Sequence, residues 1–395
     1  MGLGTTVEQQ GGSGHVRGVA FSSSAPGDLL IGSQEGTAEV VADGAAIRIH
    51  APSSGNGNII FGSGPGSTGS MRVLNGGKGA LGFSEGGASD ARVIFGGNAG
   101  GTGDSTVSGA GPDGTPSRLI LAGTGSVFGD GAGSRGTLNV LSGGKATSMP
   151  SGQSMPVADP QLGANGGTGI ATISGLGSVW NILGQTSLGG PVGEVGNLHV
   201  GGPGGTGVLT LADGGRVALG QGAITLNTDT VTNPGQQYYT LTDFTPGLGT
   251  VFVAEQPGST GTVNFGAPAG SAPVAPGTLD AAAVQFGDGN GRIVFNHTAP
   301  DFTYSIPTSG PGTVQTLAGT TVFDTPGAMT YTGPTLVDGG ILRAGAVDVL
   351  SQGSQHSVGQ AGQLDLAGFN QTVPGMTNAG LITMNPAPGA VPGTT

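Results

Sequence analysis

Short runs in which apolar and polar residues alternate recur along the chain, separated by glycine-rich turns. The copies are GTLNVLSGGK, GSMRVLNGGK, GVLTLADGGR and the looser GTAEVVADGAA, at residues 136–145, 69–78, 207–216 and 36–46. Alternate residues of a strand point to opposite faces of a sheet. Each copy therefore predicts a strand that buries the third and fifth residues of the copy, such as Leu138 and Val140. The residue between these positions is expected to face water; it is Arg72, Asn139, Thr210 or Glu39.

Two further families of short repeats support a repeating strand-and-turn structure. One pairs LAGTGSVF with ISGLGSVW, and the other ends apolar runs in a glycine corner: IIFGSGPG, VIFGGNAG and LHVGGPGG at residues 59–66, 93–100 and 198–205. The turn glycines of the first family are unevenly spaced, at Gly44, Gly76, Gly143 and Gly214. No single period fits, so we predict several strands in each coil, with insertions between coils.

Glycine and proline nearly exclude helices. The 395 residues include 86 Gly and 25 Pro, which interrupt almost every window long enough for three helical turns. A glycine inside a helix costs about 1 kcal/mol relative to alanine. Stacked coils explain the glycines, because tight corners need positive φ, and stacking buries a core that one coil cannot bury alone. We therefore predict an all-β solenoid, with a β-sandwich or barrel as the alternative.

The charge balance argues against nucleic acid as a partner. The formal net charge is −12, and the 11 Lys and Arg residues are scattered along the sequence. Phosphate backbones are bound by Lys and Arg that displace counterions. The chain has no Cys, so it has no disulfide or thiolate nucleophile. It also shows neither a signal-peptide pattern at its start nor an apolar stretch long enough for a transmembrane helix.

Gly143, Gly144 and Lys145 resemble half of a phosphate-binding loop. That loop reads G-x-x-x-x-G-K-[ST] between a strand and a helix. Here Asn139 replaces the first glycine, Ala146 follows the lysine, and no helix is predicted. At the lysine position the related copies have Lys78, Arg216 and Ala46. We interpret the segment as a corner between strands, with Lys145 in water.

The other candidate motifs are incomplete. Ser84 lies in a G-x-S-x-G pattern without the strand–turn–helix context of a nucleophile elbow. Asp104 in GGTGDSTV stands one residue too early for a calcium-binding nonapeptide. No two histidines are spaced as metal ligands; they are His15, His50, His199, His297 and His356. We predict no catalytic, cofactor-binding or metal-binding residues, and we expect the only tryptophan, Trp180, to pack in the core or at its edge.

Two stretches resemble a known family. YTGPTLVDGGILRAG at residues 331–345 and LDLAGFNQTV at 364–373 resemble the autotransporter-associated β-strand repeat of type V secretion passenger domains in Gram-negative bacteria. The matching residues are Tyr331, Thr332, Gly333, Thr335, Gly340, Leu342 and Gly345. ISGLGSVW and residues 198–217 are similar to the glycine-rich repeat of such proteins. The resemblance implies a parallel β-helix, expected to be right-handed, that is displayed at the cell surface.

On this basis the chain divides into five segments. They are an N-terminal segment or cap (1–29), glycine-rich β-helix repeats (30–220), a less regular β segment (221–300), the autotransporter-associated repeat (301–383) and a Pro/Gly-rich tail (384–395). The secretion signal and the outer-membrane β-barrel that the family implies are not recognised in the sequence. We therefore expect the chain to be an excerpt of a larger protein or a truncated gene product.

The predicted function is a non-enzymatic, surface-exposed or secreted passenger that acts in adhesion, aggregation or biofilm formation. Its expected partner is a host or neighbouring-cell surface, with no nucleic acid, small-molecule substrate or cofactor. Two alternatives remain open. The passenger carries a hydrolase module within residues 220–300, where the repeats fade, or it is a passive stalk that displays another domain.

Overall fold

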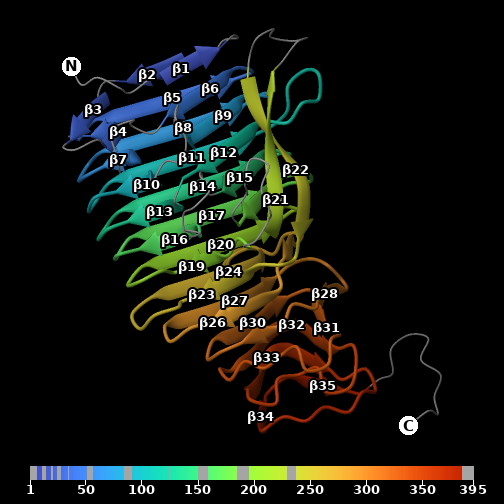
Figure 1. The fold of residues 1–395 in the computed structure, drawn as a ribbon. Helices are drawn as coiled ribbons and strands as arrows, with labels where there is room; N and C mark the ends of the chain where they lie inside the picture. Colours follow the sequence, from blue (N-terminus) through green and yellow to red (C-terminus); the bar gives the residue numbers. More distant parts are fainter. Residues whose placement is uncertain are drawn as a thin grey trace.

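The computed structural model is built from strands in the part of the chain that it describes (Figure 1). The described residues are 7–10, 15–18, 21–24, 28–33, 35–50, 57–83, 91–123, 125–149, 159–184, 195–228 and 237–384. The strands form three long sheets, A, B and C, in which neighbours from successive coils run parallel. The all-β solenoid expected from the sequence is confirmed, and the barrel alternative is wrong.

In the regular part of the stack, each sheet collects one strand from each coil. Sheet A contains β1 (Val7–Gln10), β6 (Ala46–His50), β9 (Lys78–Phe83), β12 (Arg118–Ala122), β15 (Lys145–Met149), β18 (Val179–Leu183), β21 (Arg216–Thr228), β22 (Gln237–Pro246) and β25 (Thr278–Asp280). Sheet C contains β3 (Phe21–Ser24), β4 (Asp28–Ser33), β7 (Ile59–Ser63), β10 (Val93–Gly97), β13 (Ser126–Asp130), β16 (Gln161–Ala164), β19 (Leu198–Val200), β23 (Thr250–Val253), β26 (Ala283–Phe286) and β29 (Thr308–Ser309).

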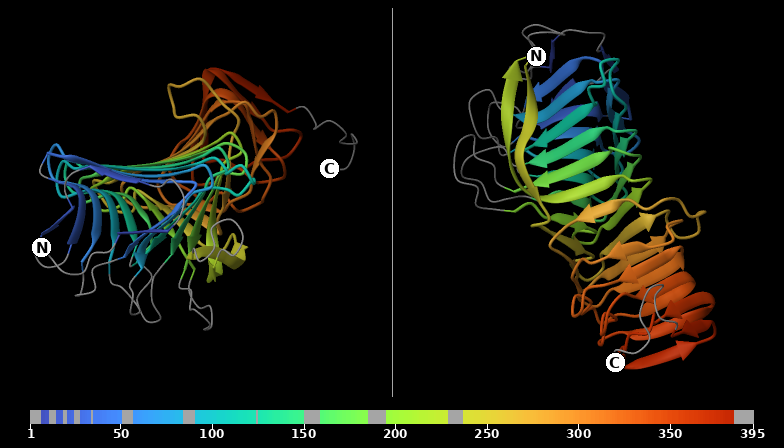
Figure 2. Two further views of the ribbon diagram at one scale, coloured as in Figure 1. Left: turned by 90° about the horizontal axis from the view of Figure 1, so that it is seen from above. Right: turned by 90° about the vertical axis from the view of Figure 1, so that its right-hand side faces the viewer.

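Sheet B is the longest of the three. It contains β2 (His15–Gly18), β5 (Thr37–Asp43), β8 (Thr68–Leu74), β11 (Thr102–Ser108), β14 (Arg135–Leu141), β17 (Thr168–Ser174), β20 (Thr206–Ala212), β24 (Thr260–Gly266), β27 (Asn290–Asn296), β28 (Phe302–Tyr304), β30 (Thr313–Ala318), β31 (Thr320–Phe323), β32 (Thr335–Ala344), β33 (Gln355–Asp365), β34 (Gly375–Asn378) and β35 (Leu381–Thr383). The regular coils visit sheets C, B and A in turn and stack along one axis (Figure 2).

The register of sheet B explains the irregular repeat. Gly69, Gly136 and Gly207 occupy one position of the sheet, and Gly103 and Gly169 occupy the same position on the strands between them. Each step from one of these glycines to the next is one coil. The recognised copies at 69–78, 136–145 and 207–216 are therefore two coils apart, whereas the copy at 36–46 lies one coil before the first of them. The uneven spacing of the turn glycines reflects the skipped coils.

Two of the sequence alignments are wrong in detail. In the looser copy the sequence alignment matched Ala38 with Met71. In the structure Val40 pairs with Met71 instead, so the register of β5 against β8 differs from the alignment by two residues. The segments LAGTGSVF and ISGLGSVW lead into different sheets, since Val127 belongs to sheet C and Val179 to sheet A. The same turn chemistry thus serves two different corners.

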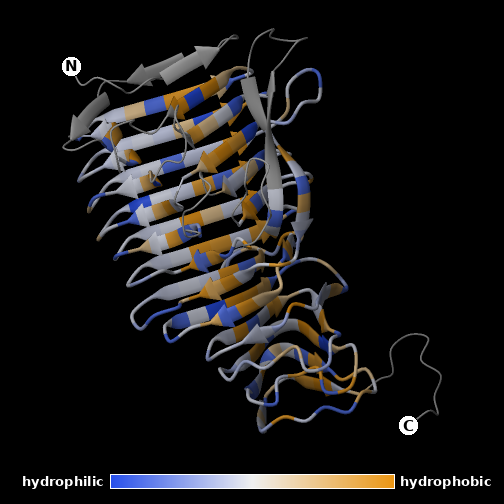
Figure 3. Cartoon of the chain, in the orientation of Figure 1, coloured by the Kyte–Doolittle hydropathy of each residue, from blue (hydrophilic) through white to orange (hydrophobic). Residues whose placement is uncertain are grey.

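Buried apolar side chains of successive strands form columns inside the solenoid. Figure 3 shows apolar residues recurring on successive strands of the stack. One column of sheet B contains Val73, Val107, Val140, Ile173, Leu211, Phe265 and Phe295, each at most 1% exposed. In sheet C the rings of Phe61, Phe95 and Phe128 stack, with centroids 4.6 and 5.3 Å apart. Thr210, expected to face water, is instead buried and accepts a hydrogen bond from the Asn264 amide at 3.1 Å.

Ser105 interrupts a neighbouring apolar column, between Met71 and Leu138. Its side chain is fully buried, and its hydroxyl has no hydrogen-bond partner among the residues that the structure describes. We expect Ser105→Ala to raise the free energy of unfolding by about 1 kcal/mol, because an unpaired buried hydroxyl is removed. Ser117→Ala is the matched control, since the buried Ser117 hydroxyl donates to the Ser108 carbonyl and accepts from the Gly76 amide. Chemical denaturation checks both, and equal destabilisation by the two changes would refute the prediction.

Both ends of the regular stack depart from the parallel pattern. At the N-terminal end, β1, β2 and β3 pair antiparallel with β6, β5 and β4, so that each sheet edge is covered. Near the C-terminal end, β32 pairs with β30 through its first residues and with β31 through its last. There the Tyr331 hydroxyl is hydrogen-bonded to Thr335 Oγ1 at 2.6 Å, which gives two residues of the stretch at 331–345 a structural role.

Residues 221–300 contain one inserted hairpin and then further coils. β21 extends past its neighbours in sheet A, and β22 returns antiparallel beside it. From β23 onward the chain resumes the stack, with Val253 in register with Val200 and Val263 with Leu209. The hairpin is therefore added to the outer face of the wall, by which we mean the stacked sheets of the solenoid.

Candidate binding groove

Basic residues gather in one column at the start of the sheet A strands. Arg118 of β12 is in register with Lys78 of β9 on one side and with Lys145 of β15 on the other. Val179 follows on β18, and Arg216 on β21 continues the column. Four of the chain's 11 Lys and Arg residues thus occupy five successive strands. Basic residues that are scattered along the sequence are thus brought together by the fold.

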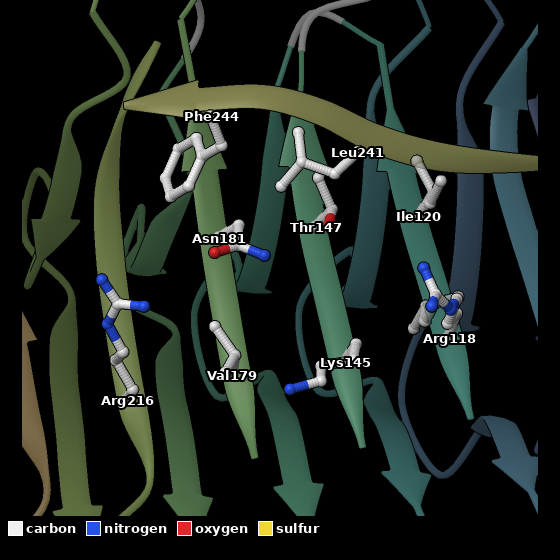
Figure 4. A pocket seen from close by; sticks show the side chains of 10 residues that line it. Arg118, Ile120, Lys145, Thr147, Val179, Asn181, Arg216, Leu241 and Phe244 are labelled. Carbon is white, nitrogen blue, oxygen red and sulfur yellow. The ribbon is translucent and has the colours of Figure 1, made fainter. Parts of the chain in front are cut away.

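The hairpin turns this column into one side of a groove of about 260 Å³. Strand β22 crosses above β12, β15 and β18, and its Leu241 and Phe244 point toward the sheet (Figure 4). These two side chains pack against an apolar cluster on the outer face of sheet A: Ile120, Ala122, Met149 and Leu183. The groove therefore has an apolar side under β22 and a cationic side formed by Arg118, Lys145 and Arg216.

The floor between these two sides is partly polar. Thr147 of β15 and Asn181 of β18 are adjacent in the register and line the groove. Thr147 follows Lys145 by two residues, and Asn181 follows Val179 by two. Because side chains two residues apart on a strand share a face, both point to the same outer face as the basic column. The groove offers cations, hydrogen-bonding groups and an apolar surface within one short stretch of wall.

The three cations of the groove differ in their partners. The Arg216 guanidinium forms an ion pair with Asp280 of β25. Lys145 Nζ donates a hydrogen bond to the Gly177 carbonyl at 2.5 Å. Burial lowers the pKa of the Lys145 ammonium, and the neighbouring charges of Arg118 and Arg216 lower it further. Lys145 is thus half-buried beside other cations, whereas the sequence placed it in water.

The Gly-Gly-Lys segment itself is a turn whose backbone amides are already used. Ser142 and Gly143 both have positive φ, at 50° and 83°. The Gly143 amide donates to Ser178 Oγ at 3.0 Å, the Gly144 amide to the Leu141 carbonyl, and the Lys145 amide to the Ser117 carbonyl. A phosphate loop needs such amides to point at the ligand. The segment therefore has the geometry of a corner, and only the Lys145 side chain belongs to the groove.

The other candidate residues lie apart from the groove. Asp104 on β11 accepts a hydrogen bond from Thr137 Oγ1 at 2.5 Å. Trp180 is fully buried in the core, where its indole donates to Ser148 Oγ at 3.0 Å. Ser84 lies outside the described residues, as do the side chains of His15 and His50. Within the described ranges, no three His, Cys, Asp or Glu residues are grouped so that they could hold a metal ion.

His199 lies on the outer face of sheet C between two carboxylates. Its Nδ1 is 2.9 Å from Glu255 Oε2, and its Nε2 is 3.5 Å from Asp159 Oδ2. Burial alone would lower the pKa of His199, but the hydrogen bonds and charges of Asp159 and Glu255 outweigh it and raise the pKa. The resulting stabilisation is fully present below pH 6.5 and is lost as the pH rises through the raised pKa.

His297 is a core histidine. Its side chain is fully buried among Phe295 and Phe302, with Nε2 3.0 Å from Thr321 Oγ1. Burial lowers the pKa of His297 from 6.5 to about 4. The neutral ring is therefore the folded form, and the unfolded chain binds the proton first as the pH falls.

We expect the stability to fall between pH 6.5 and pH 4, and His297 to account for about 3 kcal/mol of the loss. His199 adds no slope in this range, because its stabilisation is already complete there. Denaturation midpoints measured across the range test this. His297→Gln keeps a polar group toward Thr321 but does not titrate. Between pH 6.5 and pH 4, the free energy of unfolding of this variant should therefore fall by about 3 kcal/mol less than that of the wild type. An unchanged slope in the variant would contradict the assignment.

Sequence reasoning missed the groove because its parts are far apart in the chain. Arg118, Lys145 and Arg216 belong to three different coils, and the wall residues Leu241 and Phe244 come from the hairpin inserted after the last of these coils. The one available signal was the lysine position of the first repeat family, where basic residues recur at Lys78, Lys145 and Arg216.

Comparisons with known proteins add no identification. No family model, curated protein or solved structure matches the chain. A search of the described residues for a helix long and apolar enough to span a membrane also found none.

Proposed function

We propose that the chain is a non-enzymatic binding wall: a surface-exposed or secreted β-helix of the autotransporter passenger type that acts in adhesion or aggregation. The observation that carries the proposal is the solenoid itself. Columns of apolar side chains fill its interior, so the side chains that can contact a partner lie on the outer faces of the three long sheets. A rigid, extended surface of this kind suits binding along its length.

Two features support adhesion in preference to the alternatives. Residues 220–300 contribute the β21–β22 hairpin and continuing coils, and their described part holds no separate core that a hydrolase module would need. The groove beneath β22 combines cationic, polar and apolar groups in one hollow, a feature that suits binding and that a passive stalk does not require. Display by type V secretion rests on the resemblance of residues 331–345 and 364–373 to passenger repeats.

Adherence of protein-coated beads tests the proposal. Beads coated with the purified chain should adhere to bacterial or host cells, while beads coated with the heat-unfolded chain should not. The same preparation should turn over no substrate in a panel for esterases, proteases and glycosidases. Turnover of any substrate, or equal adherence of the folded and unfolded chains, would contradict the proposal.

A further inference from the structure

Arg118 and Lys145 lie opposite each other in the basic column of sheet A, a pairing that is unfavourable for folding. Like charges directly opposite each other on neighbouring strands destabilise a sheet. Lys78, Arg118 and Lys145 nevertheless occupy three consecutive strands of a protein with a net charge of −12. Neither Arg118 nor Lys145 has an ion-pair partner among the described residues. An anionic ligand would relieve the repulsion between these two cations, and no carboxylate of the described wall does so.

The spacing of the column favours a linear ligand with regularly spaced charges. Strands in a sheet lie about 4.8 Å apart, so Arg118 and Lys145 stand one strand spacing apart along the solenoid axis, and Arg216 follows two spacings further on, beyond Val179. The sugar units of an extended acidic polysaccharide repeat at a comparable distance, and each uronate unit carries one carboxylate. Double-stranded nucleic acid carries a charge about every 1.7 Å, a density that this short column in an acidic protein does not match.

The rest of the groove fits a carbohydrate. The Thr147 hydroxyl and the Asn181 amide can exchange hydrogen bonds with sugar hydroxyls, and Phe244 offers a ring to the apolar face of a pyranose. The volume of about 260 Å³ lies just below the range of pockets that enclose a small ligand, about 300 Å³ and above. A few units of a longer chain would therefore lie in the groove, with the remainder outside it.

The geometry points to the groove between the basic column and β22 as a binding site for an acidic, uronate-containing polysaccharide. Arg118 and Lys145 contact its carboxylates, Thr147 and Asn181 its hydroxyls, and Phe244 its sugar ring. Arg216 is held by Asp280 and closes the end of the site. The inference rests on the proposed adhesive function, for which it names the ligand class and the binding surface.

Isothermal titration calorimetry with hexagalacturonate tests the site. The wild-type chain should bind it at low ionic strength, whereas the neutral maltohexaose should bind far more weakly. Arg118→Gln/Lys145→Gln should weaken binding by about tenfold or more, and Phe244→Ala by about fivefold. The matched control, Arg72→Gln/Arg292→Gln, removes two cations from sheet B and should bind as the wild type does.

Salt gives a second reading that does not depend on any variant. Wild-type affinity should fall as NaCl is added, because carboxylate contacts to Lys and Arg are screened. The inference is overturned if hexagalacturonate does not bind, if Arg118→Gln/Lys145→Gln binds as tightly as the wild type, or if a single-stranded hexanucleotide binds more tightly. Cell adherence without uronate binding would overturn this inference and leave the proposed function standing. Failure of beads coated with the folded wild-type chain to adhere to cells would overturn the proposed function.

Discussion

Val140→Asp is expected to destabilise the solenoid by more than about 4 kcal/mol. Val140 is fully buried on β14, between Val107 of β11 and Ile173 of β17 in the same column. A carboxylate at this position would be surrounded by apolar side chains above and below, with no cation to pair with it. Guanidinium denaturation followed by far-UV circular dichroism should show a large drop in the midpoint, or a chain that does not fold.

The neighbouring residue provides the control. Asn139 points to the opposite face of the same strand and is half-exposed. Asn139→Asp adds the same charge on the water side, so the free energy of unfolding should change by no more than about 0.5 kcal/mol. If both variants were equally tolerated, the inside and outside faces of β14 would be wrongly assigned.

Gly136→Ala should have the second-largest effect. A Cβ at Gly136 would lie 2.2 Å from the Gly129 amide nitrogen and 2.2 Å from the Phe95 carbonyl oxygen. These are backbone atoms of adjoining strands, which cannot move aside without shifting the stack. We expect a loss of about 3 kcal/mol or more, measured by the same denaturation.

Gly114→Ala separates crowding from backbone strain. Gly114 has a φ of +80°, and a Cβ there would meet no atom within 4 Å. Gly114→Ala should lower the free energy of unfolding by only about 1 to 2 kcal/mol, the cost of holding an alanine at a positive φ. A loss at Gly136 no larger than the loss at Gly114 would show that the coils are not packed as closely as described.

The inside of the wall was readable from the sequence because it depends on local order. A period of two assigns Leu138 and Val140 to the core from their spacing alone, and glycine marks the corners. Register between coils is not local. The copy at residues 36–46 was aligned two residues out of place, and this shift preserves which residues face inward while changing which residues are neighbours.

The candidate site was not readable for a related reason. Whether Lys145 stands in water or beside Arg118 depends on the lengths of the loops that bring β12 and β15 together. The groove also needs β22, whose packing on Ile120 and Met149 follows from an apolar cluster on the outside of sheet A. Alternation along a single strand does not reveal such a cluster, because its members come from different strands.

The central claim is that the folded wall itself is the binding element. The most direct measurement compares cell adherence of beads coated with the wild-type chain, with Asn139→Asp and with Val140→Asp, at equal surface density. The account predicts equal adherence for the first two and loss of adherence for Val140→Asp, in parallel with loss of its far-UV β signal. Full adherence by a Val140→Asp chain that has lost its β-structure would contradict it.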